Sequence, residues 1–78
     1  MKTVKVYSTS SCPWCVRAKE YLRKKNIPFD DIDVGRDVEK AKEMVKISGQ
    51  MGVPVITVDN EVVIGFDQNK LEQLLGIG

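Results

Sequence analysis

Residues 4–15 have the sequence VKVYSTSSCPWC and contain the signals that decide the fold. The first of them alternate in character, with Val4 and Val6 on one face of an extended chain and the residues between them on the other. This alternation predicts a strand over residues 3–8. A short polar loop, residues 9–11, separates the strand from the first of two cysteines.

A helix is predicted over residues 13–25, immediately after Cys12. In this stretch Cys15, Ala18 and Leu22 recur at spacings of three and four, which is the pattern of a stripe buried against a core. The helix therefore begins at the cysteine motif and holds one of the two cysteines on its inner face.

The rest of the chain adds further elements at short spacing. They are predicted as a strand, a helix, two strands and a helix, over residues 29–34, 37–47, 54–58, 62–64 and from Asp67 onward. The second helix is expected to turn four apolar residues inward, namely Val38, Ala41, Met44 and Val45. Asp30 and Asp31 interrupt the alternation of the second strand, which a bulge or a position at the sheet edge would explain.

The predicted order is therefore β-α-β-α-β-β-α. Two strands joined through a helix should pair in parallel, with a right-handed crossover. The last two strands are joined only by Asp59-Asn60, so they should form an antiparallel hairpin. The expected architecture is α/β: a four-stranded mixed sheet with three helices packed on it, in a single domain over residues 1–78.

Composition excludes several classes of protein. The 78 residues suffice for one small domain, and 42% apolar with 29% charged residues is ordinary for a globular chain. The formal net charge of +1 gives no electrostatic reason to expect a nucleic acid or an anionic membrane as partner. No apolar run approaches the ~18 residues of a membrane span, and the N-terminus lacks the apolar core of a signal peptide. We therefore expect a cytoplasmic protein, and a monomer.

The histidine and cysteine counts narrow the chemistry. The chain has no histidine, which excludes Ser-His-Asp and Cys-His nucleophile systems. Its two cysteines, Cys12 and Cys15, cannot supply a four-ligand zinc site, and no metal is expected. Two cysteines so close together also do not make the disulfide framework of a secreted mini-protein. What remains is a Cys-x-x-Cys pair between a strand and a helix, which is the context of a redox site.

Cys12 and Cys15 are expected to differ in reactivity. Proline favours the first position of a helix, so Pro13 makes Cys12 the capping residue. The free N–H groups there and the positive end of the helix dipole should lower the pKa of the Cys12 thiol. Cys12 would then attack an external disulfide, and Cys15, on the buried stripe, would attack Cys12 and release the reduced partner.

Two other interpretations of the pair stay open beside the redox one. It could be half of a metal site, although a second pair or histidines are absent, or it could be two core cysteines, although Cys12 is predicted on a polar loop. The redox interpretation is favoured over both because of the strand before the motif and the helix after it. Trp14, near the start of that helix, is expected at the rim of the site, where it would contact the partner.

Three motifs resemble those of the glutaredoxins. Residues 6–15, VYSTSSCPWC, resemble the segment with their usual Cys-Pro-Tyr-Cys site. Val53-Pro54 resembles the Val-Pro before the third strand of thioredoxin-fold proteins, and Gly65-Phe66-Asp67 lies where glutaredoxins have Gly-Gly-Cys/Ser-Asp-Asp. The resemblance covers nearly the whole chain and implies a thioredoxin fold, with Cys12 as the nucleophile and Cys15 as the resolving thiol.

The resemblance also implies a site for glutathione as the reducing co-substrate. The Val53–Pro54 bond would be cis, and the Val53 backbone would pair with the glutathione peptide as a strand does. Asp67, with the backbone at Phe66, would receive the amino end of glutathione. Asp67 equally suits the N-cap of the last helix, so both interpretations stand. The binding residues implied are Thr9, Pro13, Trp14, Val53, Pro54, Gly65, Phe66 and Asp67.

Several positions depart from the glutaredoxin pattern. Many glutaredoxins have a lysine three residues before the nucleophile, where it meets a glutathione carboxylate, and this chain has Thr9 there. Gln68 stands in place of the second aspartate, Ile64 in place of the first glycine, and Gly52 in place of the threonine that often precedes Val-Pro. Gly65-Phe66 instead resembles the ribonucleotide-reductase-associated redoxins, which thioredoxin reductase reduces, although these usually have Val-Gln between the cysteines.

Three functions follow from the resemblance. In the first, the protein reduces protein disulfides or glutathionylated proteins, with glutathione as the reductant. In the second, thioredoxin reductase feeds the same exchange, and the protein is an electron donor, for example to ribonucleotide reductase. In the third, a dimer holds an iron–sulfur cluster between two copies of Cys12. The bulky Pro13-Trp14 disfavours the third, because cluster-binding glutaredoxins usually have small residues there.

Overall fold

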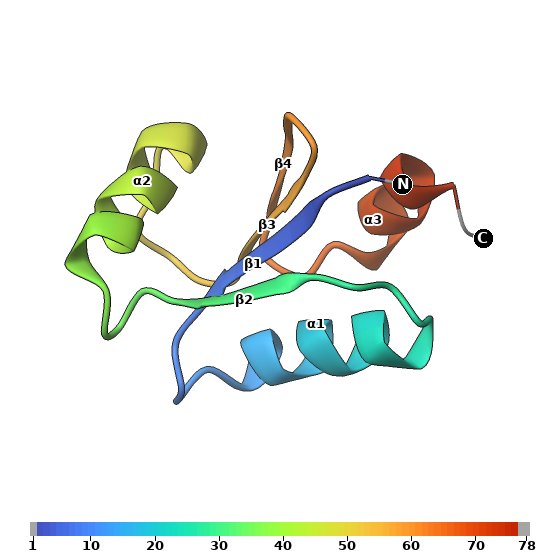
Figure 1. Cartoon of the computed structure of the whole chain (residues 1–78), viewed down its shortest axis with the longest axis horizontal. Helices are drawn as coiled ribbons and strands as arrows, with labels where there is room; N and C mark the ends of the chain where they lie inside the picture. Colours follow the sequence, from blue (N-terminus) through green and yellow to red (C-terminus); the bar gives the residue numbers. More distant parts are fainter. Residues whose placement is uncertain (1, 77–78) are drawn as a thin grey trace.

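The computed structural model of the chain describes residues 2–76. Its elements in that range are, in order, β1 (Val4–Ser8), α1 (Pro13–Lys24), β2 (Asp30–Asp33), α2 (Val38–Ser48), β3 (Val55–Val58), β4 (Glu61–Ile64) and α3 (Gln68–Leu75). Figure 1 shows their arrangement. The β-α-β-α-β-β-α order predicted from the sequence is confirmed, and each predicted boundary lies within about one residue of the observed one.

The strands form one mixed sheet in the order β2-β1-β3-β4. β1 pairs in parallel with β2, with Val6 opposite Asp31, whereas the β1–β3 and β3–β4 pairs are antiparallel. β2 therefore lies at the edge of the sheet, where charged residues such as Asp30 and Asp31 are tolerated. In the β3–β4 turn, Asp59 has a left-handed backbone (φ 53°), which aspartate adopts more readily than most residues.

Helices cover both faces of the sheet, so the fold has three layers. α1 and α3 pack on one face, over the larger apolar cluster of Val4, Val6, Ala18, Leu22, Ile56, Val58, Val63 and Leu71. α2 packs on the other face, over the smaller cluster of Tyr7, Met44 and Val55. The division follows from the alternation along β1, which directs Val6 to one face and Tyr7 to the other. Over the described residues, the predicted four-stranded mixed sheet with three helices is confirmed.

α2 buries less of its surface than the sequence predicts. Met44 is buried and Ala41 is half-buried, as expected, but Val38 is 67% exposed and Val45 is 36% exposed, so the prediction for these two valines is wrong. Figure 1 shows α2 toward one end of the sheet, and its contacts there are with β1 and β4. A helix that covers only the margin of a sheet buries a narrow stripe, and here that stripe is centred on Met44.

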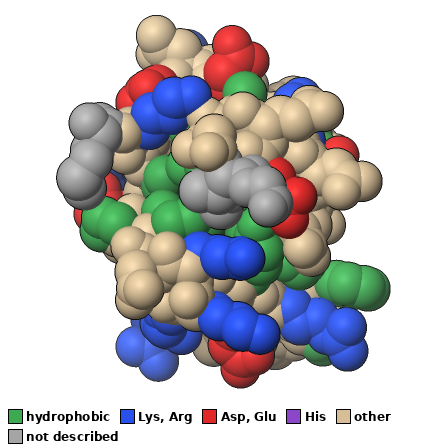
Figure 2. Space-filling view, turned by 90° about the vertical axis from the view of Figure 1, so that its right-hand side faces the viewer, with side chains coloured by type: hydrophobic (Ala, Val, Ile, Leu, Met, Phe, Trp, Pro, Cys, Tyr) green, Lys and Arg blue, Asp and Glu red, His purple; other side chains and the backbone are tan. Residues whose placement is uncertain are grey.

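α1 ends where its sequence stops favouring a helix. Its last residue is Lys24, and Asn26 has a left-handed backbone (φ 58°) that ends the helical path. Arg23 and Lys24 form a basic last turn. Figure 2 faces this end of the molecule, and Lys and Arg side chains gather over its lower part, where α1 ends. These charges complement the negative end of the α1 dipole, which gives the basic run a structural explanation.

Candidate active site

Cys12 caps the N-terminus of α1. Its backbone is extended, Pro13 occupies the first helical position, and Cys12 Sγ accepts a hydrogen bond from the Cys15 N–H at 3.2 Å. The side chain is only half-buried, so an external disulfide can reach the sulfur. The donated N–H and the positive end of the helix dipole both lie at this sulfur. The prediction that Cys12 is the capping residue is confirmed.

Cys15 is fully buried (0% exposed) on the inner face of α1. Burial, together with the hydrogen bond to Cys12 and the charge of that neighbour, raises the pKa of the Cys15 thiol to about 11. A hydrogen bond with the Thr9 backbone and the positive charge of Lys19 act in the opposite direction. At neutral pH, Cys15 is therefore a thiol. Of the two cysteines, Cys12 is the one that combines access with helix N–H stabilisation.

An open groove of about 290 Å³ lies beside Cys12, and it is lined by Trp14, Val53, Pro54, Gly65 and Phe66. The Val53–Pro54 bond is cis, and the Cys12 thiol lies 3.9 Å from the Val53 carbonyl oxygen, toward which it donates. Trp14 is 57% exposed at the rim, as predicted, with the Arg17 guanidinium 5.1 Å from its ring. The structure therefore brings these predicted binding residues together within reach of Cys12.

The other predicted binding residues have different surroundings. Pro13 is exposed at the first position of α1. Asp67 caps α3, because its Oδ1 accepts the Lys70 N–H at 3.1 Å, and it follows the groove residue Phe66 directly. The predicted N-cap is thus confirmed, whereas a role of Asp67 in binding stays a prediction. Thr9 does not line the groove but a second pocket, on the far side of the cysteine loop.

A polar cluster beneath α1 was missed by the sequence analysis. Lys19 Nζ donates to Ser8 Oγ at 3.3 Å and to Asp31 Oδ2 at 3.2 Å, and Ser8 Oγ donates to Asp31 Oδ1 at 3.3 Å. Ser8 is 1% exposed, and the Lys19 side chain is 16% exposed. One signal could have pointed to it: Lys19 follows Cys15 by four residues and so lies on the same face of the helix.

The described part of the chain shows neither a metal-binding cluster nor a membrane-spanning helix. Among residues 2–76, no three His, Cys, Asp or Glu side chains are grouped so that they could hold a metal ion. Over the same residues, no helix has the length and apolar character needed to cross a membrane. The candidate site in this range comprises the two thiols, the groove and the polar cluster of Ser8, Lys19 and Asp31.

The mixed sheet, the Cys-x-x-Cys pair at the start of the first helix and the cis proline beside it define a redox protein of the thioredoxin fold. Proteins of this class carry out thiol–disulfide exchange. The family model of the glutaredoxins matches residues 4–63. The chain belongs to the glutaredoxin family of thiol–disulfide oxidoreductases.

Individual relatives agree with this assignment. A glutaredoxin-like 8.6 kDa protein of the rubredoxin operon of Clostridium pasteurianum is 44% identical over 72 residues, covering 92% of this chain and 96% of that protein. Glutaredoxin 3 of Escherichia coli is 36% identical over 67 residues, covering 86% and 81%. Among solved structures, a mutant of the thioredoxin-like protein BC3987 is 36% identical, with a TM-score of 0.92 and full coverage of both chains. A glutaredoxin from Archaeoglobus fulgidus is 29% identical, with a TM-score of 0.87 and coverage of 96% and 87%.

Proposed function

We propose that this chain is a dithiol oxidoreductase that reduces protein disulfides and glutathione mixed disulfides, with glutathione as its reductant. The observation that carries the proposal is the contrast between the two cysteines. Cys12 is accessible, and its sulfur accepts an N–H from the first turn of α1, whereas Cys15 is fully buried one turn away with a pKa raised to about 11. One sulfur suits attack from outside, and the other suits an intramolecular second step.

The proposed cycle has two exchanges. The Cys12 thiolate attacks one sulfur of the target disulfide, which breaks that bond, forms a mixed disulfide and releases the other target sulfur as a thiolate. Cys15 then loses its proton and attacks Cys12 Sγ, which breaks the mixed disulfide and leaves a Cys12–Cys15 disulfide and a reduced target. Two equivalents of glutathione return the protein to the dithiol and leave as glutathione disulfide.

The groove supports glutathione or an extended peptide as the ligand. The backbone at Val53 lies next to the Cys12 sulfur, so a peptide joined to Cys12 as a mixed disulfide would run along this segment. The exposed Asp67 carboxylate follows the groove residue Phe66 and is available to an ammonium group of that peptide. These features favour a ligand with a free amino end, as glutathione has.

One observation favours a second candidate, in which thioredoxin reductase supplies the electrons and protein disulfides are the substrates. The residues that line the groove include neither Lys nor Arg, and Thr9, at the position of the family's lysine, lines the other pocket. A tripeptide with two carboxylates would thus find little positive charge in the groove. A protein partner could instead gain from the exposed Trp14 ring.

Supplying the oxidised protein with NADPH and one of two systems distinguishes the candidates: glutathione with glutathione reductase, or thioredoxin reductase alone. We expect Cys12-dependent NADPH consumption with the glutathione system. Consumption with thioredoxin reductase alone would favour the second candidate. Cys12→Ser should abolish all activity, and activity retained by this variant would refute both candidates. Cys15→Ser should keep most reduction of glutathionylated substrates but lose reduction of protein disulfides.

A further inference from the structure

Cys15 must become a thiolate for the second exchange, although it is fully buried. Its ionisation is opposed most by burial and then by Cys12, whose thiolate is hydrogen-bonded and adjacent. Only a hydrogen bond with the Thr9 backbone and the charge of Lys19 favour it. When Cys12 is joined to a target in a mixed disulfide, its sulfur has no charge. The balance at Cys15 then depends on burial against Thr9 and Lys19.

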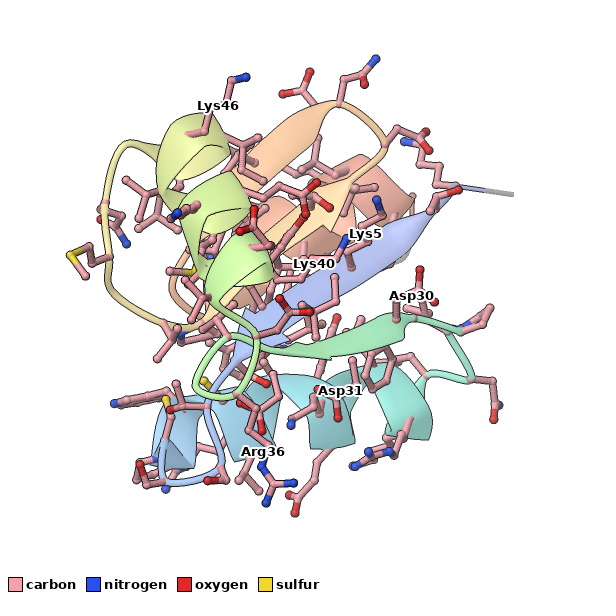
Figure 3. All side chains as sticks on the ribbon, turned by 60° about the vertical axis from the view of Figure 1, so that its left-hand side comes forward. Lys5, Asp30, Asp31, Arg36, Lys40 and Lys46 are labelled. Atoms are coloured by element: carbon pink, nitrogen blue, oxygen red, sulfur yellow. The ribbon has the colours of Figure 1, made fainter. Side chains whose placement is uncertain are left out.

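Lys19 is held where its charge can act on Cys15. It lies four residues further along α1, and side chains at this spacing lie one above the other on a helix, with Cβ atoms about 5–6 Å apart. Its ammonium donates to Ser8 Oγ of β1 at 3.3 Å and to Asp31 Oδ2 of β2 at 3.2 Å. Figure 3 shows Asp31 on the α1 side of β2 and Asp30 on the other side.

This arrangement is not that of a surface ion pair. The Lys19 side chain is only 16% exposed, and a lysine is seldom buried so far unless its charge is paired or used. Its aspartate partner, by contrast, is 45% exposed and borders the pocket lined by Ser8, Thr9, Ser10, Lys19, Asp31 and Asp33. Water in that pocket can therefore reach the cluster, which gives a proton from this region a path to solvent.

We propose that Lys19 is a positioning residue for the resolving step: held by Ser8 and Asp31 beneath α1, its ammonium stabilises the Cys15 thiolate that attacks Cys12. The inference rests on the proposed two-step exchange and assigns it a further residue. In this step the Cys15 S–H proton leaves to water. The Cys15–Cys12 bond then forms while the bond between Cys12 and the target sulfur breaks, and the target leaves as a thiolate.

The groups that set the pH dependence of the step come from α1, from its cap Cys12 and from β2. Cys12 and Lys19 of α1 act on Cys15 directly. Asp31 and Asp33 of β2 lie around the lysine, and Asp33 is engaged by the Gly35 N–H at 2.9 Å. Of these groups, Lys19 is the one that places a positive charge near Cys15, so its ammonium is the group whose removal should change the resolving step.

Dithiobis(nitrobenzoate) gives a direct measurement of both exchanges, without glutathione or any reductase. Attack by Cys12 releases one coloured thiolate in a first phase, and resolution by Cys15 releases a second. Stopped-flow absorbance from pH 6 to 9 follows both phases in wild type, Lys19→Met, Lys19→Arg and Lys24→Met. Lys24 is the matched control, because it is an exposed lysine of the same helix. Cys15→Ser identifies the second phase by its loss.

We expect Lys19→Met to slow the second phase about three- to tenfold at pH 7, with the first phase within about twofold of wild type. The second phase of both proteins should become faster as the pH rises, because Cys15 reacts as its thiolate. Lys19→Arg should restore most of the rate, and Lys24→Met should match wild type. Circular dichroism checks that each variant is folded, and Lys19→Gln repeats the test with a polar side chain.

Three results would overturn the inference. A second phase of Lys19→Met and Lys19→Gln equal to that of wild type would show that the ammonium is not used. The same slowing in Lys19→Arg, which keeps the positive charge, would show that the side chain only supports the packing of α1. A wild-type protein with a first phase and no second phase would refute the two-step exchange itself, and with it the proposed function.

Discussion

Substitution of Asp67 separates two roles that one carboxylate would have at the start of α3. Its Oδ1 accepts the Lys70 N–H at 3.1 Å, which is the capping role, and its free charge would bind the amino end of glutathione, which is the ligand role. Asp67→Asn keeps an oxygen acceptor but removes the charge, whereas Asp67→Ala removes both. The two variants should therefore differ in stability but not in affinity for a glutathionylated substrate.

The expected changes in Tm and KM follow from the cap that Asp67 makes and from its exposed charge. Loss of an N-cap costs ~1 kcal/mol, and asparagine caps about as well as aspartate. In a domain of this size ~1 kcal/mol corresponds to a fall in Tm of roughly 4–8 °C, so Asp67→Ala should show this fall and Asp67→Asn only a small part of it. The exposed carboxylate would attract an ammonium group ~4 Å away by ~1 kcal/mol, so both variants should raise KM for a glutathionylated peptide about fivefold.

Asp37→Ala on α2 is the matched control. Asp37 is also exposed, and its Oδ1 accepts the Lys40 N–H at 3.1 Å, but it caps a helix on the other face of the sheet. It should lower Tm by the same few degrees and leave KM unchanged. Thermal unfolding followed by circular dichroism and steady-state kinetics with the peptide give both quantities. An unchanged KM in Asp67→Asn would refute the ligand role, and an unchanged Tm in Asp67→Ala beside a lowered one in Asp37→Ala would refute the capping argument for α3.

Three further predictions concern the core, a buried phenol and the thiols. Leu22→Ala should lower the free energy of unfolding, measured with urea, by about 2–5 kcal/mol because Leu22 is fully buried. Val38→Ala, at a 67% exposed position, should change it by less than ~0.5 kcal/mol. A large loss in Val38→Ala would contradict the position of α2 at the margin of the sheet. Burial and the hydrogen bond to Glu43 raise the pKa of Tyr7 to about 12. The contribution of Tyr7 to the free energy of unfolding should therefore be complete below pH 10 and decline from pH 10 to 12. Urea titrations of Tyr7→Phe should lack this decline. At pH 8 the native reduced protein should take up one equivalent of iodoacetamide, with Cys15 labelled only after unfolding, and early labelling of Cys15 by mass spectrometry would contradict its burial.

Signals that act within a few residues predicted most of this structure. Pro13 after Cys12 is sufficient to predict the cap, because the residue types and their order set the helix start. The two aspartates of β2 indicated a bulge or an edge strand, and the structure shows that β2 is an edge strand. The same local reasoning predicted the β3–β4 hairpin and the Asp67 cap.

Features that depend on how far one element extends over another could not be predicted this way. Periodicity identifies which residues of α2 share a face, but it does not say how much sheet lies beneath them, so Val38 and Val45 were wrongly expected in the core. The contact between Lys19 and Asp31 likewise requires the packing of α1 against β2, to which the sequence gives no guide. Thr9 was expected in the binding groove, and only the path of the loop shows that it borders the other pocket.

The order of the two exchanges follows from this packing. Cys12 and Cys15 are chemically identical and one helical turn apart, so their side chains alone do not determine which reacts first. The helix start gives one sulfur an N–H donor and access to solvent, and the sheet gives the other a surrounding that keeps it a thiol. Formation of the mixed disulfide then removes the Cys12 charge, which is one of the causes that raise the pKa of Cys15. In the proposed cycle the first exchange would thus prepare the second, and a target would be bound covalently before the thiol that releases it becomes reactive.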